Sequence, residues 1–202
     1  SERIVLVVFL MLFIGGGATV YYNMHMANEY VTGDDFLDVR EAYERKFKQY
    51  ETLPPMYWED IKTTVDFYPE ENSYHIKADY VVVNREDDAI TELFITARIP
   101  LKEIFLENAE LVASFPEFDS YLFKFNKAVE PNESIKFNYQ INYKVSGYAF
   151  DQEIIKNGTY LSHRSFEPSL SYRSGMEIPD NFEREKRGLP IKADEELTDE
   201  PL

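Results

Sequence analysis

The sequence predicts a mainly β protein, in which a transmembrane helix and an amphipathic helix precede an antiparallel β-sandwich or an open, saddle-like sheet. Three observations predict it. An uncharged apolar run occupies residues 4–21, and apolar residues recur at spacings of three and four between residues 34 and 51. From residue 60 onward, apolar and polar residues alternate. The length of the first run suits a bilayer, the second pattern is typical of a helix and the third of strands.

The apolar run, IVLVVFLMLFIGGGATVY, predicts a transmembrane helix over residues 1–22. At about 1.5 Å per residue it spans roughly 27 Å, close to the roughly 30 Å thickness of a hydrocarbon core. A secretory signal peptide is the alternative, but its apolar stretch usually has only about 7–15 residues. No A-x-A cleavage site follows the run, and only Arg3 precedes it as a basic residue. The domain that follows is therefore expected to face water.

Small residues at positions 15–19, GGGAT, are of the kind that lets transmembrane helices approach closely. They favour the last span of a polytopic domain, while a single-pass anchor stays open because isolated spans also contain small residues. Tyr21 and Tyr22 are expected at the membrane surface, as in an aromatic belt. Since the chain begins at Ser1, we expect either a processed protein or a piece of a longer one.

Charge separates the rest of the chain from nucleic-acid-binding proteins. Removing Glu2 and Arg3 from 21 basic and 37 acidic residues leaves 20 and 36, so the net charge of −16 belongs to about 180 residues after the helix. Nucleic acid is not an expected partner, because neutralising phosphates requires clustered Lys and Arg. Arg3 before the helix and the acidic excess after it favour an extracytoplasmic domain. The chain has no cysteine, which excludes disulfides and thiolate metal sites.

Residues 23–59 are predicted to form a connector and an amphipathic helix. The helix is expected over residues 34–51, with its acidic start at the positive N-terminus and Pro54 beyond its end. Its apolar stripe is expected to pack on the β domain, or alternatively on a neighbour near the membrane. The stripe consists of Phe36, Val39, Tyr43, Phe47 and Tyr50.

Residues 60–190 are predicted to form the antiparallel β domain, and residues 191–202 an acidic tail or loop. Alternation predicts five strands with one packed face and one solvated face. Their inward residues run over 61–67, 74–82, 93–99, 121–125 and 135–145. Asn157 and Gly158 predict a turn. Near the end, a short helix is expected over residues 180–187, with Asp180 as its N-cap and Gly188 as its C-cap.

The sequence predicts no catalytic, cofactor-binding or metal-binding residue in this chain. Its three histidines, His25, His75 and His163, have no second histidine at ligand spacing, and no H-E-x-x-H occurs. Acidic pairs occur at turns or helix starts, where carboxylates are favoured locally. No G-x-S-x-G elbow or phosphate-binding glycine loop occurs either.

A series of short motifs resembles those of a known protein family, and the order of the motifs is the main evidence for the resemblance. After the apolar helix come YN, NEY, AYERKFK, VDFYP, VEPNES, NGTY and FEPSLSY, from Tyr22 to Tyr172. Together they resemble bacterial proteins that fuse an ABC-type permease to a gluzincin peptidase like aminopeptidase N. The resemblance implies that this chain is the last permease helix and the start of the peptidase's N-terminal β domain.

The resemblance implies a function without catalysis inside this chain. The family's zinc ligands, general base and transition-state tyrosine have no matching positions here, so zinc is expected only in a downstream catalytic domain of the parent protein. Gly175, Met176 and Glu177 resemble the G-x-M-E-N loop, but Ile178 stands in place of asparagine, and no role is carried over. Asn132 replaces the glycine of the family's Pro-Gly-Glu turn.

The expected function is therefore a membrane-anchored scaffold for that downstream domain, with further strands beyond Leu202 completing an open sheet. The alternatives are a noncatalytic single-pass ectodomain that binds a peptide, glycan or protein, and a structural subunit of an envelope complex. Expected partners are the membrane, other transmembrane helices of the same or a partner protein, and peptides.

Overall fold

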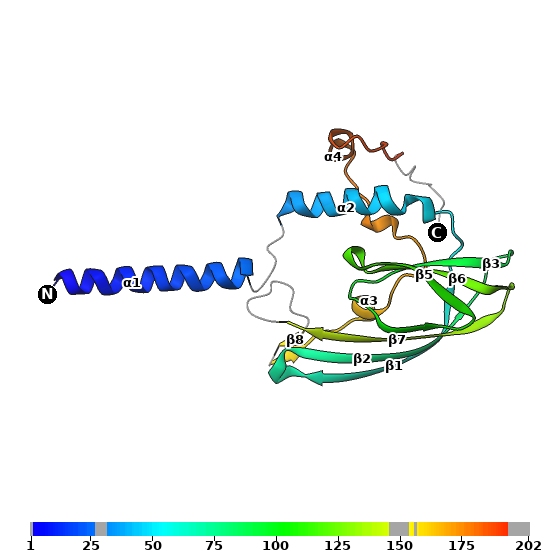
Figure 1. The fold of residues 1–202 in the computed structure, drawn as a ribbon, viewed down its shortest axis with the longest axis horizontal. Coiled ribbons are helices and arrows are strands. Elements are labelled where there is room, and N and C mark those ends of the chain that lie inside the picture. Colours follow the sequence, from blue (N-terminus) through cyan, green and yellow to red (C-terminus); the bar gives the residue numbers. More distant parts are fainter. Residues whose placement is uncertain (1, 27–31, 146–153, 156, 194–202) are drawn as a thin grey trace, which may run out of the picture.

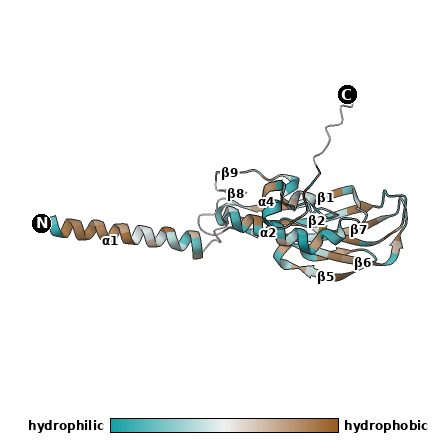
Figure 2. Cartoon of the chain, turned by 90° about the horizontal axis from the view of Figure 1, so that it is seen from above, coloured by the Kyte–Doolittle hydropathy of each residue, from teal (hydrophilic) through white to brown (hydrophobic). Residues whose placement is uncertain are grey.

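The computed structural model describes residues 2–26, 32–145, 154–155 and 157–193. Helix α1 spans Glu2–Tyr21 and continues into a π-helical turn over Tyr22–Met26. It extends away from the rest of the molecule (Figure 1), and all of its residues are exposed. Glu2–Met26 is apolar and long enough to cross a membrane, and an 18-residue stretch within it has a mean hydropathy of 2.4. The expected apolar N-terminal helix is therefore confirmed, and the colours of Figure 2 mark hydrophobic residues along much of its length.

Helix α2 spans Gly33–Phe47, so it ends before the predicted boundary at residue 51. A capping box sets its start: the Thr32 hydroxyl accepts a hydrogen bond from the Asp35 amide at 3.1 Å, and the Asp35 carboxylate accepts one from the Thr32 amide at 2.9 Å. Beyond Phe47 the chain tightens into a 3₁₀ turn over Lys48–Tyr50.

Seven antiparallel strands form two sheets that do not close into a barrel (Figure 1). The four-stranded sheet has the order β1-β2-β7-β4 and the three-stranded sheet the order β3-β6-β5. The strands are β1 (Tyr57–Tyr68), β2 (Ser73–Val83), β3 (Ile90–Thr96), β4 (Lys102–Leu106), β5 (Ala109–Phe115), β6 (Ser120–Val129) and β7 (Ser134–Lys144). The expectation of a mainly antiparallel β fold after an apolar helix is confirmed.

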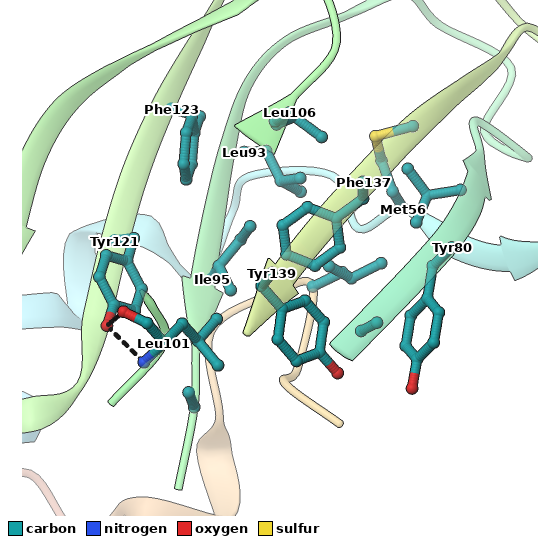
Figure 3. Packing of buried hydrophobic residues seen from close by; sticks show 14 of the residues in the cluster. Met56, Tyr80, Leu93, Ile95, Leu101, Leu106, Tyr121, Phe123, Phe137 and Tyr139 are labelled. Carbon is teal, nitrogen blue, oxygen red and sulfur yellow. Dashed lines mark hydrogen bonds between the residues drawn. The ribbon is translucent and has the colours of Figure 1, made fainter. Parts of the chain in front are cut away.

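The main core lies between the two sheets, where their inward side chains meet (Figure 3). On β7, Ile135, Phe137, Tyr139 and Ile141 are buried and alternate with polar residues, as their period predicts. Opposite them, Leu93 and Ile95 come from β3 and Phe123 from β6. The Tyr121 hydroxyl satisfies the Leu101 amide at 3.0 Å, so this buried edge of the core keeps its hydrogen bonds.

The three-stranded sheet is packed on both faces, which corrects the expectation of one solvated face. Its outer residues Phe94 and Leu122 are buried against Tyr43 and Phe47 of α2. The helix therefore adds a third layer, and the expected packing of its stripe on the β domain is confirmed for its C-terminal half. In the N-terminal half, Phe36 stays exposed. The outer face of the four-stranded sheet is mostly polar, as predicted, although Phe105 of β4 is exposed beside Asn138 of β7.

Strands β4 and β5 were not predicted, and each has an irregular register. The pairing of β4 with β7 shifts between Lys102 and Phe105, where Glu103 has a positive φ of 48°. The pairing of β5 with β6 shifts between Leu111 and Ala113. A bulge adds a residue to one strand and interrupts the period of two on which the prediction depends.

Short elements complete the C-terminal third of the described chain. Strands β8 (Ile154–Ile155) and β9 (Gly158–Thr159) have two residues each and pair antiparallel, with the predicted turn at Asn157 between them. The one-turn helix α3 spans His163–Phe166 and was not predicted. Helix α4 spans Asn181–Lys186, and Asp180 caps it as expected by accepting a hydrogen bond from the Glu183 amide at 2.9 Å. Most of the predicted acidic tail, residues 194–202, lies outside the described residues.

Candidate functional site

A pocket of about 670 Å³ lies between α2 and the segment that follows β9. We call this region the α2 joint. Its apolar wall comes from residues 189–191, and its charged lining is Glu44, Arg45, Lys48, Glu51, Glu177, Arg184 and Lys192. The lining of the pocket therefore combines a helix from the start of the domain with residues more than 100 positions later in the chain.

A buried ion pair stands at the centre of the joint. The Arg184 guanidinium binds the Glu44 carboxylate through two hydrogen bonds, Nη1 to Oε2 at 2.8 Å and Nη2 to Oε1 at 2.6 Å. The two side chains are only 3% and 5% exposed. The same guanidinium donates to the carbonyls of Ile178 at 2.9 Å and Pro190 at 2.6 Å. This fork-to-fork geometry satisfies both charges and fixes the segment around α4 onto α2.

Glu177 forms the second polar centre of the joint, with a side chain that is 1% exposed. Its carboxylate accepts hydrogen bonds from Lys48 at 2.7 Å and from the Tyr172 hydroxyl at 2.9 Å, and pairs with Lys192 at 2.7 Å. Burial by itself would raise the pKa of Glu177. The hydrogen bonds from Lys192, Lys48 and Tyr172 outweigh that effect and lower the pKa to about 2.

The lowered pKa of Glu177 predicts a loss of stability in acid. An unfolded glutamate titrates near 4.5, so the stabilisation from the ionised carboxylate is complete above that pH and is lost as the pH falls toward 2. Urea unfolding at pH 7, 5, 4 and 3 measures the slope. We expect Glu177→Gln to lower stability at pH 7 and to flatten the decline below pH 4.5. Glu110→Gln, at an exposed strand position, is the control and should keep the wild-type slope; equal slopes for all three proteins would contradict the prediction.

The charges of the α2 joint bind one another, which suits a structural connection better than a reaction. Glu44 and Glu177 each have a cationic partner inside the joint. A general base or nucleophile needs a free face toward substrate. The residues instead connect α2, the segment from Tyr172 to Glu177 and α4 as one unit.

The three histidines considered from the sequence lie on different elements. His25 is in the π-helical turn, with its ring 4.8 Å from that of Tyr21. His75 is on the outer face of β2, where its Nε2 lies 3.0 Å from Oε1 of Gln140. His163 begins α3. Within the described ranges, no group of three His, Cys, Asp or Glu side chains is arranged to hold a metal ion.

Strand β1 presents a second surface, at one edge of the four-stranded sheet. Its inward residues Ile61 and Phe67 are each 45% exposed, although they pair with buried Tyr80 and Tyr74 of β2. Among the described residues, no strand pairs with the other side of β1. An edge of this kind offers free backbone groups and apolar side chains to a further strand.

No protein-family model matches this chain, and neither a curated protein nor a solved structure matches it. The class is therefore defined by the fold and the site: an exposed apolar helix followed by an open antiparallel β domain whose α2 joint is held by buried ion pairs. The permease and peptidase resemblance stays a prediction.

Sequence reasoning missed Glu44, Glu177 and Arg184 as joint residues. Glu44 carried a usable signal, because it lies next to Tyr43 and three residues before Phe47, at the border of the apolar stripe of the helix. A carboxylate next to a buried stripe needs a cationic partner. That partner, Arg184, lies 140 residues away, and no local pattern indicates it.

Proposed function

We propose that this chain is a membrane-anchored β domain that acts as a scaffold for a further, zinc aminopeptidase-like domain of a permease and peptidase fusion. The observation that supports membrane anchoring is that α1 extends away from the β domain (Figure 1). Its apolar side chains are exposed along the whole helix, while the β domain has its own core. An exposed apolar helix of this length is stable in lipid and costly in water.

Two features of the β domain support the scaffold role. The exposed inward residues of β1 leave part of the sheet available for more chain, as an incomplete sheet requires. The α2 joint holds the segment up to Ala193 firmly on α2, so a following domain would leave from a fixed point. A scaffold needs such a fixed end of the chain to orient an attached domain.

Carbonate extraction of membranes tests the anchoring. We expect the full chain to stay in the membrane pellet and a variant without residues 1–22 to move to the supernatant. Leu10→Asp with Phe13→Asp is the matched full-length control, since each aspartate raises the free energy of membrane insertion by about 2.5–3.5 kcal/mol at the centre of a span. If the intact chain appears in the carbonate supernatant, α1 does not span the membrane.

The alternative function is a noncatalytic ectodomain that binds a peptide, glycan or protein through its sheet. The exposed apolar edge at Ile61 and Phe67 favours it equally, because a partner strand would fit there. The complete reading frame distinguishes the two functions. Several apolar spans upstream and H-E-x-x-H with a later glutamate downstream support the fusion, whereas a terminator at Leu202 supports the ectodomain.

A further inference from the structure

A basic pocket of about 270 Å³ lies where the segment containing α3 crosses the end of β3. Three arginines, a histidine, a tryptophan and a glutamate line it: Arg98, Arg164, Arg173, His163, Trp58 and Glu167. The chain as a whole has a net charge of −16. Three arginines around one small pocket therefore contrast with the charge of the rest of the molecule.

Hydrogen bonds to backbone groups, two of them made by tyrosine hydroxyls, hold the segments that carry the arginines in place. Thr96 of β3 pairs with Ser169 through two bonds of 3.0 and 2.8 Å, which places Arg98 beside the segment that follows α3. The Tyr139 hydroxyl on β7 donates to the Phe166 carbonyl at 3.0 Å and fixes the end of α3. The Arg173 amide donates to the Tyr43 hydroxyl at 3.0 Å. The pocket is thus built from four separate parts of the fold.

The guanidinium groups of this pocket have no ion-pair partner within the part of the chain that the structure describes, although Glu167 also lines the pocket. Arg184 and Arg187 both form ion pairs, but no ion pair involves Arg98, Arg164 or Arg173. Neighbouring like charges repel one another, and a bound anion removes that repulsion. The pocket therefore has both the charge and the free donors that an anionic ligand requires.

The charge of the lining indicates the class of anion. Three arginines and Glu167 sum to +2 with His163 counted as neutral, which matches a dianion. Guanidinium groups bind phosphate and carboxylate through paired hydrogen bonds. We propose that this pocket binds a dianionic group, either a phosphomonoester or a dicarboxylate, carried on an apolar body that packs against Trp58. The proposal does not depend on the scaffold function.

Trp58 supplies the apolar wall. Its ring meets Tyr80 edge-on at 5.2 Å and stacks on Phe137 at 6.1 Å, so the core holds it in position while part of it stays accessible. The pocket volume lies slightly below the range of about 300–1,000 Å³ found for small-molecule sites. It therefore suits the charged end of a ligand rather than a whole cofactor.

The single tryptophan of the chain makes the test direct, because fluorescence excited at its absorption edge reports on Trp58 alone. The full chain, in a maltoside micelle that carries no phosphate or carboxylate, is titrated with phenyl phosphate, with succinate, and with sodium chloride at matched ionic strength. We expect a saturable change with phenyl phosphate or succinate and none with chloride. Saturation by only one of the two probes identifies the dianion as a phosphomonoester or a dicarboxylate.

Variants link the signal to the pocket. Arg98→Gln and Arg164→Gln, both at exposed positions, should each weaken binding about tenfold or more, as expected for the loss of hydrogen bonds to a charged group. Arg85→Gln removes an exposed arginine outside the pocket and should bind as the wild type does. Titration calorimetry gives a second readout that is independent of Trp58. The proposal is overturned if neither probe gives saturable fluorescence or heat, or if both pocket variants keep the wild-type affinity.

Discussion

Replacing Phe47 with alanine is expected to lower the free energy of unfolding by about 3–5 kcal/mol. Phe47 is fully buried between α2 and the three-stranded sheet. Its ring contacts four other aromatic rings at centroid distances of 4.9–5.2 Å, namely Tyr43, Phe94, Phe115 and Phe118. Alanine would leave a cavity in this second core and weaken the attachment of α2. Urea unfolding of the full chain in a non-ionic detergent, followed by circular dichroism, measures the change.

Phe36→Ala is the matched control on the same helix. Phe36 is 51% exposed and lies outside the packed half of α2, so we expect its replacement to cost far less than that of Phe47. Similar losses for the two variants would mean that the packing of α2 on the three-stranded sheet contributes little to stability.

Replacing Arg184 with methionine is expected to cost about 3–5 kcal/mol, because it leaves the Glu44 carboxylate buried without its partner. Four hydrogen bonds to Glu44, Ile178 and Pro190 are lost with the guanidinium. The loss should be visible as a lower urea midpoint. It should also expose the segment around α4 to limited proteolysis, since Arg184 holds that segment on α2.

Two controls separate the buried charge from the loss of side-chain volume. Glu44→Leu with Arg184→Met removes both charges and should be less destabilising than Arg184→Met alone. Arg45→Met breaks the more exposed pair with Glu41 and should cost less than about 1 kcal/mol. A double variant as unstable as the single one would show that the loss does not come from the unpaired buried carboxylate of Glu44.

Strand β7 illustrates how far local sequence determines this fold. Its alternation specifies both that it is a strand and which residues point inward, because side chains alternate across a strand regardless of what lies on either side. The same holds for α1, whose uncharged run over residues 4–21 indicates a helix long enough to cross a membrane, and for Asp180, whose side chain caps the next turn of backbone. In each case the property depends on the residues of that segment and not on a distant part of the chain.

The local sequence of a strand does not determine which face of its sheet another element covers. The sequence of β3 and β6 predicts an inward face, yet only the docking of α2 buries Phe94 and Leu122 on the opposite face. Bulges in β4 and β5 likewise follow from their pairing partners, since an extra residue in one strand is defined only relative to its neighbour.

The sequence by itself determined the apolar helix, the β class, the inward face of the main strands and the acidic character of the domain. Only the tertiary structure decided the α2 joint and the basic pocket. Glu44 meets Arg184 across 140 positions, and Arg98 joins Arg164 and Arg173 through the pairing of Thr96 with Ser169. Periodicity arises from the geometry of a single element, whereas these sites form where separate elements pack, and that packing depends on the shape and burial of the whole domain.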